Sequence, residues 1–383
     1  MYELHLRHYD RAGVLQRTVL EPLWARYTDQ VNDALPLVFA LNADDPEAAV
    51  MAEMDIFEVM LRNKILGIQD VDGGFVRVYV GILRDWDMST NDDGITTMEY
   101  RCPGENHILS WRSVLYPANT NNRSSFSAAA AETLYKTLVQ YNLTSDASVA
   151  NGRQRNGDLL PGMGYDVTNA APGGLGNPIS AAFMGGNVLG VMQKLAEQAG
   201  GDFALRWQGG DAWEFEFYLG QLGQDKSSGA ERVLFSMNTD TMSKPRLQRR
   251  GARATAATAA GQGEDDLRMI EVVTGPDYAA DYDFEMFVDA RNEKTAAGVA
   301  FRGEQKLEET RIEEALSFGV LQTSRQFYSP VPVIGRKTYK TGDLVLVDYG
   351  GESVRKIESV TVNWKAPGNG DAFLVDVETR EVV

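Results

Sequence analysis

Hydrophobic and polar residues alternate along much of the chain, most clearly near its C-terminal end. Within 339–383, three runs rich in valine, leucine and aromatic residues are separated by glycine-containing turns. In the second run Val360, Val362 and Trp364 share one face, and polar residues share the other. Such alternation between glycine turns predicts an antiparallel meander with one buried face.

The first 118 residues follow the same two-residue period and predict another group of strands. The predicted strands are 2–7, 15–27, 35–41, 55–61, 75–86 and 95–101, with tight turns at 10–13, 72–74 and 91–94. The segment 48–51 could form a short helix before its strand.

Between these β-rich ends the period changes to that of helices. Helices are expected at 128–141 with Ser127 as the N-cap, at 187–199 before Gly200, and at 304–319. Further strands are expected at 203–207, 213–218, 232–238, 253–260, 269–273 and 284–288, with 232–238 paired to 253–260. The segment 144–180 is rich in Asn, Gly, Asp and Pro and predicts a long loop. The overall pattern is that of a β-rich α+β fold.

Composition narrows the class of protein. With 383 residues, 43% of them hydrophobic and 24% charged, the chain is expected to fold into two to four globular domains. No apolar run approaches the roughly 20 residues that span a bilayer, so no membrane insertion is expected. A single cysteine, Cys102, excludes an internal disulfide and suits a reducing cytosol.

The charge balance is acidic, with 54 Asp and Glu against 37 Lys and Arg and a formal charge of −17. Such a surface repels phosphate backbones, so it argues against nucleic-acid binding. The acidity serves either solubility or the exclusion of passing nucleic acid. The one basic cluster contains Arg246, Arg249, Arg250 and Arg253, and we interpret it as a solvated loop or as a contact for an acidic partner.

Few residues favour metal or cofactor chemistry. The three histidines are His5, His8 and His107, and the first two point to opposite faces of one strand. The sequence contains no metalloprotease, nucleophile-elbow or phosphate-loop motif. We interpret 70–73 as a turn rather than a calcium loop, and 173–178 as a flexible loop rather than a dinucleotide site. No cofactor, metal or catalytic residue is predicted.

Paired carboxylates beside tryptophan leave one enzymatic alternative open. The pairs are Asp85 and Asp87 beside Trp86, and Glu214 and Glu216 beside Trp213. Carboxylates two residues apart on a strand lie about 7 Å apart, which would fit an inverting glycosidase. Any charged strand face has the same spacing, so a solvated face is the favoured interpretation. A cell-wall glycan hydrolase or a glycan-binding module remains the alternative function.

Three segments of the chain resemble a known family. They are Tyr2-Glu3-Leu4-His5-Leu6-Arg7 with Tyr9-Asp10-Arg11-Ala12-Gly13, Phe287-Val288-Asp289-Ala290-Arg291, and Tyr339-Lys340-Thr341-Gly342-Asp343-Leu344-Val345. In their order along the chain they resemble the baseplate hub proteins of tailed bacteriophages. The resemblance is to the structural hub module that opens the tail-associated lysins of long, non-contractile tails.

The resemblance implies a fold with two antiparallel β-barrel domains of the tail-tube type. The first barrel would be 1–118, and the second would combine 231–265 with 326–383. Helix-bearing α/β segments, 119–230 and 266–325, would lie between them.

The resemblance also implies a structural role without catalysis. Three copies would form a ring that joins a six-fold tail tube to a three-fold tail tip and surrounds the DNA-ejection channel. The expected partners are the protein itself as a homotrimer, the tail-tube or distal tail protein, tip or fibre proteins, and the tape-measure protein. DNA would pass through the lumen without specific binding. The protein would be assembled in the host cytoplasm and reside at the distal end of the tail, with any lytic activity on another chain.

Overall fold

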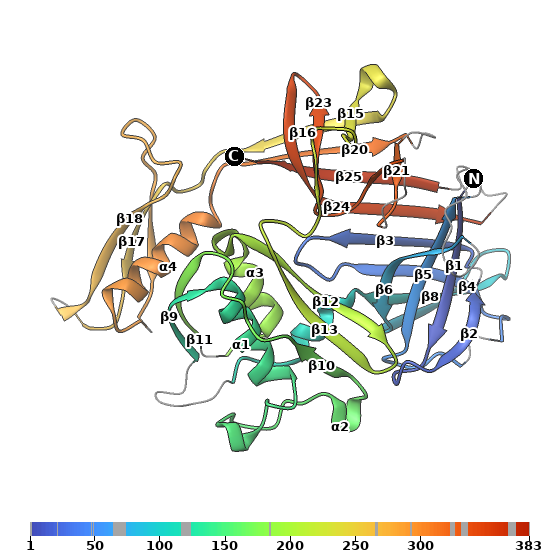
Figure 1. Cartoon of the computed structure of the whole chain (residues 1–383), viewed down its shortest axis with the longest axis horizontal. Helices are drawn as coiled ribbons and strands as arrows, with labels where there is room; N and C mark the ends of the chain where they lie inside the picture. The colour runs from blue at the N-terminus through green and yellow to red at the C-terminus, as the bar shows by residue number, and fades with distance from the viewer. Residues whose placement is uncertain are drawn as a thin grey trace.

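The computed structural model describes residues 2–20, 22–46, 48, 50–63, 74–115, 124–183, 185–264, 267–291, 293–321, 326–330, 336–366 and 373–382. As predicted, it is a β-rich α+β protein with few helices (Figure 1). In the described part of the chain, no helix is both long and apolar enough to cross a bilayer.

The largest sheet joins the two ends of the chain. Its main path runs, in order, through β16 (Met242–Arg250), β20 (Glu313–Val320), β25 (Phe373–Glu381), β24 (Glu352–Lys365), β3 (Trp24–Gln30), β4 (Pro36–Asn42), β8 (Thr96–Pro103) and β7 (Asp85–Thr90). Beside this path, β23 (Leu344–Asp348) pairs with β24, and β14 (Asp225–Lys226) and β15 (Leu234–Ser236) pair with β23. The predicted C-terminal meander is confirmed, and Val360 and Val362 on its apolar face are fully buried.

A second sheet packs against the apolar face of the first (Figure 1). It consists of β2 (Leu15–Leu20), β1 (Tyr2–Tyr9), β5 (Ile56–Asn63) and β6 (Val76–Ile82), in that order. Leu4 and Phe57 from this sheet share one core with Phe39 and Val360 from the large sheet. The core therefore unites residues from both ends of the chain. The division into the two barrels 1–118 and 231–265 with 326–383 stays a prediction.

The middle of the chain forms a helix-bearing unit. It contains β9 (Ser124–Ala130), α1 (Ala131–Leu143), α2 (Leu160–Met163), β10 (Asp166–Asn169), β11 (Pro178–Phe183), α3 (Val188–Ala199), β12 (Gly201–Gly209) and β13 (Ala212–Leu219). Short 3-10 helices are η1 (Glu105–Trp111), η2 (Val149–Asn151) and η3 (Met237–Thr239). The sequence signals for α3 are confirmed, because the Asn187 side chain accepts from the Gly190 amide and Gly200 is left-handed.

A small satellite unit lies at one end of the molecule. Its sheet has the order β18 (Ile270–Thr274), β17 (Ala256–Ala260), β19 (Glu285–Asp289), and α4 (Ala296–Glu308) covers one face. The remaining strands, β21 (Gln326–Tyr328) and β22 (Lys337–Tyr339), form a separate parallel pair.

One predicted helix was placed wrongly, and another has its start and its N-cap at different residues from those predicted. The helix predicted at 304–319 ends at Glu308, and 313–320 is instead strand β20, whose Leu316 and Phe318 point into the core. The helix predicted at 128–141 begins at Ala131, because residues 124–130, Ser127 among them, form β9, which pairs with β11. In both places strand pairing with a distant segment outweighs the local helical pattern.

Other strand predictions also need correction. The segments 15–27 and 75–86 each contain parts of two strands rather than one. The predicted pairing of 232–238 with 253–260 is wrong, because β15 pairs with β23 and β17 pairs with β18 and β19. The described residues of 48–51 form a turn and an irregular end, not a helix.

Candidate assembly surface

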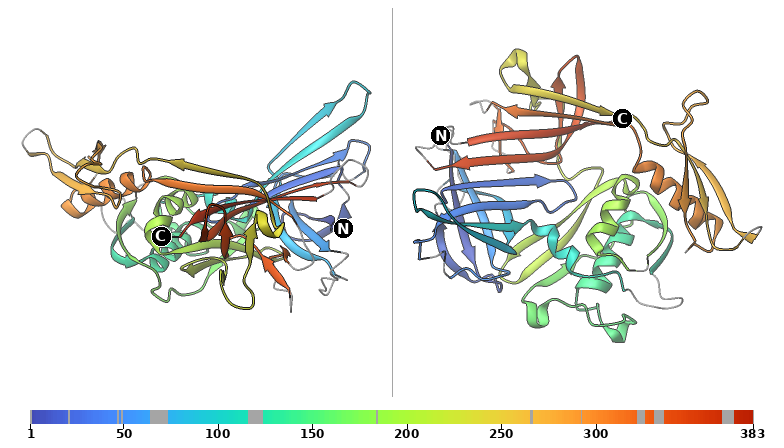
Figure 2. Two further views of the ribbon diagram at one scale, coloured as in Figure 1. Left: turned by 90° about the horizontal axis from the view of Figure 1, so that it is seen from above. Right: turned by 180° about the vertical axis from the view of Figure 1, so that it is seen from behind.

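The two terminal strands of the large sheet are the candidate functional surface. β7 and β16 each pair with one neighbour, and within the described chain their outer edges have no strand beside them. All six residues of β7 are exposed, and the β7–β8 hairpin projects from the body (cyan, Figure 2). Unpaired, exposed edges are sites where another chain can add a strand.

Both edge strands carry exposed apolar side chains on the side of the sheet that faces the core. Trp86 lies opposite the buried Tyr100, and Met88 lies opposite Met98. Trp86 is nevertheless 59% exposed and Met88 58% exposed. At the other end of the sheet, Leu247 lies opposite the buried Leu316 and is 46% exposed. Both edges thus present apolar groups on the core-facing side of the sheet.

Opposite charges occupy the other face of the same edges. Because side chains alternate, Asp85 and Asp87 point away from Trp86, and Arg246 and Arg250 point away from Leu247. Arg250 pairs with Glu313 at 3.0 Å on the exposed surface, whereas Arg246 has no ion pair among the described residues. One edge is therefore acidic and the other basic, on matching faces.

The direction of the strands also matches. Every neighbouring pair along the eight-strand path is antiparallel, so β7 and β16 run in opposite directions. A copy rotated about an axis parallel to the strands would bring β16 antiparallel to β7, with apolar faces on one side. The pairing registers shift from strand to strand, so β7 lies nearer one end of the strands and β16 nearer the other end. A closed barrel requires such a stagger.

The predicted basic cluster is divided by the structure. Arg246, Arg249 and Arg250 lie on β16, but Arg253 follows the strand and donates to the carbonyl of Glu309 at 3.2 Å. Arg246, Arg249 and Arg250 therefore belong to an exposed strand edge rather than a loop, and only Arg253 lies in the irregular segment after it, so the prediction of a loop is wrong for the first three, while the contact with an acidic partner stays a prediction.

The carboxylate pairs considered for glycan hydrolysis line neither the cavity beside Asp29 and Arg206 nor the one beside Gln193 and Lys356. Asp85 and Asp87 stand on the exposed hairpin. Glu214 and Glu216 lie on β13. Trp213 is on the same strand, but its side chain points to the opposite face and is fully buried. Glu216 accepts a hydrogen bond from Tyr218. Neither arrangement resembles a cleft that could enclose a sugar ring.

A cavity of about 300 Å³ lies where β3, β6, η1 and β12 meet. Its wall carries Asp29, Glu105 and Arg206, and Arg206 pairs with Glu105 at 3.1 Å. Burial raises the pKa of both carboxyl groups, although Arg206 opposes the rise. Glu105 also accepts from the Trp207 amide at 2.7 Å. Glu105 is bonded to Arg206 and to the Trp207 amide, and Arg206 also acts electrostatically on Asp29, which indicates a structural junction rather than an open reaction site. Sequence patterns gave no sign of this cluster, because its members come from distant segments.

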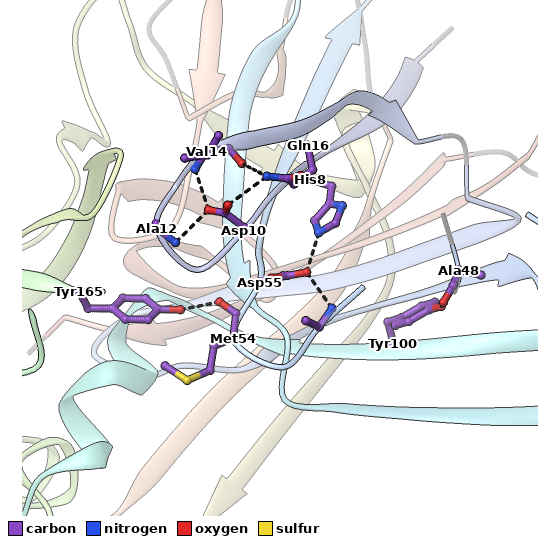
Figure 3. A network of polar contacts seen from close by, with 11 residues as sticks. His8, Asp10, Ala12, Val14, Gln16, Ala48, Met54, Asp55, Tyr100 and Tyr165 are labelled. Carbon is purple, nitrogen blue, oxygen red and sulfur yellow. Dashed lines mark hydrogen bonds and ion pairs between the residues drawn. The ribbon is translucent and has the colours of Figure 1, made fainter. Parts of the chain in front are cut away.

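A polar network around His8 connects β1 to the segment before β5 (Figure 3). His8 Nε2 lies 2.7 Å from Asp55 Oδ2, which also accepts from the Ala52 amide at 2.8 Å. The imidazole stacks on Phe57, and both His8 and Asp55 are buried. Because His8 is only 1% exposed, the pair is interpreted as a structural contact between β1 and the segment before β5.

The other titratable candidates have structural surroundings. His5 stacks on Phe75 and pairs with Glu3 at 3.0 Å. Burial and the nearby Arg84 lower the pKa of His107, which packs edge-on against Trp111. Burial raises the pKa of Cys102 well above its usual value, so the thiol is unreactive. Among the residues that the structure describes, no three His, Cys, Asp or Glu side chains come close enough to hold a metal ion.

The glycine-rich loop 173–178 donates backbone hydrogen bonds to the carboxylate of Glu132. Glu132 accepts from the amides of Gly173 at 2.9 Å and Leu175 at 3.0 Å, and pairs with Lys136 at 2.8 Å. Burial opposes ionisation, but these hydrogen bonds lower the pKa of Glu132 overall. The loop amides are therefore already satisfied, which argues against a dinucleotide site. The predicted turn at 70–73 lies outside the described residues.

Comparisons with known proteins identify a family and a solved structure with the same fold. The sequence profile of the Siphovirus ReqiPepy6 Gp37-like protein family matches residues 14–372. A tail protein from Neisseria meningitidis MC58 shares the fold, with a TM-score of 0.54 and 13% identity over 99% of this chain and 96% of that one. Prophage tail protein gp18 from Listeria monocytogenes EGD-e aligns at a TM-score of 0.47, with 11% identity over 98% of this chain and 94% of that one. No curated protein sequence matches the chain.

Proposed function

Because the chain belongs to the Siphovirus ReqiPepy6 Gp37-like protein family, we propose that it is a structural hub of a phage tail. In this role identical copies join edge to edge into a ring around the DNA-ejection channel. The ring connects the tail tube, or the distal tail protein, to tip or fibre proteins, with the tape-measure protein as a further neighbour. The fold shared with a Neisseria tail protein supports the proposal.

The observation that carries the proposal is the match between the two ends of the large sheet. Trp86 and Met88 would pack beside Leu247 of the next copy, on the face that already forms the core. Asp85 and Asp87 would lie near Arg246 and Arg250 on the other face. Burying apolar groups while pairing opposite charges favours this contact over other arrangements of the same edges.

The size of the ring favours three copies. With strands about 4.8 Å apart, two copies of the eight-strand path give a barrel about 24 Å across, and three give one about 37 Å across. Side chains pointing inward occupy about 5 Å at each wall. Two copies would leave a channel of about 14 Å and three copies about 27 Å, before strand tilt widens both. The larger channel passes a DNA duplex whatever the strand tilt, whereas the smaller one depends on that tilt, so three copies are the favoured number.

Native mass spectrometry of charge-reversed variants tests the proposal. Purified wild-type protein should have the mass of a trimer. Asp85→Lys with Asp87→Lys should shift the protein toward monomer, and so should Arg246→Glu with Arg250→Glu. Mixing the two variants should give heteromeric complexes, because both seams between unlike variants carry opposite charges, but a ring of three always keeps one seam between like charges and should form less completely than the wild-type trimer. Combining all four changes in one chain should restore the trimer.

A matched variant controls for the number of reversed charges. Asp211→Lys with Glu231→Lys changes two exposed carboxylates away from both edges, so the trimer should persist. Circular dichroism should be the same for all variants. A monomeric wild-type protein at assembly concentrations, or edge variants that still form trimers, would refute the proposed ring.

A further inference from the structure

The satellite sheet β18–β17–β19 leaves one face uncovered. Its other face is closed by α4, where Val299, Gly303 and Leu307 meet the sheet, and Gly303 lies close to Val273. α4 itself rests against the helix-bearing unit through Phe301. The helix is therefore covered on both sides, while the outer face of the sheet meets solvent.

That outer face carries a row of large apolar side chains. The strand register places Val272, Thr258 and Phe287 side by side, with Ile270 in the next row. Val272 is 67% exposed, Phe287 62% and Ile270 57%. Arg268 lies 5.7 Å from the Phe287 ring centre and still leaves most of the ring uncovered. A contiguous apolar row on a sheet face is typical of a surface that another protein covers.

The charge around this row sets the chemistry of the partner. Residues 254–310 contain thirteen Asp and Glu against five Lys and Arg, a net charge of −8 out of the chain's −17. On the outer face, Glu285 and Asp289 lie on either side of Phe287 along β19, and Asp289 is already paired with Arg268 at 3.3 Å and with Arg291 at 2.7 Å. Two copies of such a face would repel each other, and so would a phosphate backbone or an anionic membrane. A protein surface with apolar side chains surrounded by Lys and Arg is complementary to it.

The position of the unit points to a partner outside the ring. β16 leads into the satellite unit and β20 leads out of it, so the unit extends beyond the ends of the sheet strands (gold, Figures 1 and 2). The β7–β8 hairpin projects at the opposite end of the molecule (Figure 2). In a ring whose axis follows the strands, the satellite units therefore line one rim. A rim contacts whatever protein stacks on the ring, not the neighbour within it.

We propose that the outer face formed by Ile270, Val272 and Phe287 is the docking surface for a basic tail protein stacked on one rim of the ring. This inference rests on the proposed ring, which defines the rim. The apolar row supplies the buried centre of the contact, and Glu285, which has no ion pair among the described residues, pairs with a cationic side chain at its edge.

Assembled tails made with variants of the full-length chain test this surface. Val272→Ser with Phe287→Ser should leave the trimer intact by native mass spectrometry but reduce the yield of complete tails at least tenfold. Val149→Ser with Leu219→Ser is the matched control, because these side chains are 57% and 58% exposed elsewhere. The control should assemble normally. Complete tails at wild-type yield from the double serine variant would overturn the proposal.

Photo-crosslinking identifies the neighbour directly. A photoreactive phenylalanine analogue introduced at position 287 should form a covalent product in tails with a different protein, and the crosslinked peptide should contain an excess of Lys and Arg. Crosslinking to another copy of this chain, or to an acidic peptide, would contradict the proposal, as would absence of crosslinking in complete tails. A chain that fails to form trimers even without substitution would instead refute the ring, so the two failures are distinguishable.

Discussion

Val362 of β24 lies directly opposite Tyr27 of β3, and both side chains are fully buried. The pair joins the C-terminal meander to the N-terminal strands within one sheet. Next to it, the Thr28 and Thr361 hydroxyl groups lie 2.9 Å apart on the polar face. The two ends of the chain are thus one structural unit, and neither is expected to fold without the other.

Shortening Val362 tests this junction. Val362→Ala removes buried methyl groups and leaves a cavity, so the free energy of unfolding should fall by about 2 kcal/mol. Urea denaturation monitored by tryptophan fluorescence measures the change. Val354→Ala, at a partly exposed position of the same strand, should cost less than about 0.5 kcal/mol. Equal costs at the two positions would argue against a buried junction.

The segment 339–345 contains a buried carboxylate that holds the start of β23 in place. Asp343 is fully buried, pairs with Lys226 at 2.9 Å, and accepts from the Gln224 and Lys340 amides. Gly342 is left-handed, and a Cβ there would lie 2.7 Å from the Gly223 nitrogen. The carboxylate therefore fixes the start of β23 against β14.

Removing this carboxylate should be costly. Asp343→Ala leaves the Lys226 ammonium buried without its partner, so we expect the free energy of unfolding to fall by about 3–5 kcal/mol. Lys226→Met combined with Asp343→Ala should recover part of that loss, because it removes the unpaired charge. Denaturation midpoints of the two variants measure the difference. A double variant that is less stable than Asp343→Ala would contradict the ion-pair explanation.

The cavity residue Asp29 predicts how stability depends on pH. Burial raises its pKa in the folded protein, with Arg206 and Thr341 acting against the rise. Between the unfolded pKa of about 3.9 and the raised folded pKa, the folded state binds more protons than the unfolded state. The contribution of Asp29 to stability is therefore fully present below the unfolded pKa and is lost as pH rises through the folded pKa.

Comparison with Asp29→Asn isolates this contribution. The free energy of unfolding of wild type minus that of the variant should decrease as pH rises from about 4 toward neutrality. Urea titrations at several pH values provide both curves. A difference that stays constant, or that grows with pH, would show that the Asp29 carboxyl is not destabilised by burial.

Sequence patterns identified the elements whose hydrophobic period and end signals agree. α3 has Asn187 and Gly200 at its ends, and the meander has one apolar face, so both were predicted correctly. In β20, Leu316 and Phe318 already follow a two-residue period, but the helix-forming residues before Glu313 suggested that the helix continues. Local propensity could not show the pairing with β16 and β25 that decides the outcome.

The candidate surface was visible in the sequence only as separate parts. The acidic pair at Asp85 and Asp87 was interpreted as a solvated face, with catalysis as the alternative, and the cluster with Arg246 and Arg250 as a solvated loop or a contact for an acidic partner. Neither interpretation took into account that the two segments form the two edge strands of the same sheet. That relationship depends on the pairing of β24 with β3, which joins segments from opposite ends of the chain. Non-local pairing of this kind leaves no periodic signal in one sequence.

Gly303 gives a final test of how the satellite unit is held together. A Cβ at this position would lie 2.6 Å from Val273 Cγ2 and 3.4 Å from the Ala259 Cβ, so Gly303→Ala should push α4 away from the sheet. We expect a loss of about 1–3 kcal/mol, confined to this unit because its core is separate. Hydrogen exchange should rise in β17 and β18 while the β3–β24 junction stays protected. Ala297→Ser, on the exposed side of the same helix, should change neither region. Increased exchange throughout the chain would mean that the satellite unit unfolds together with the large sheet.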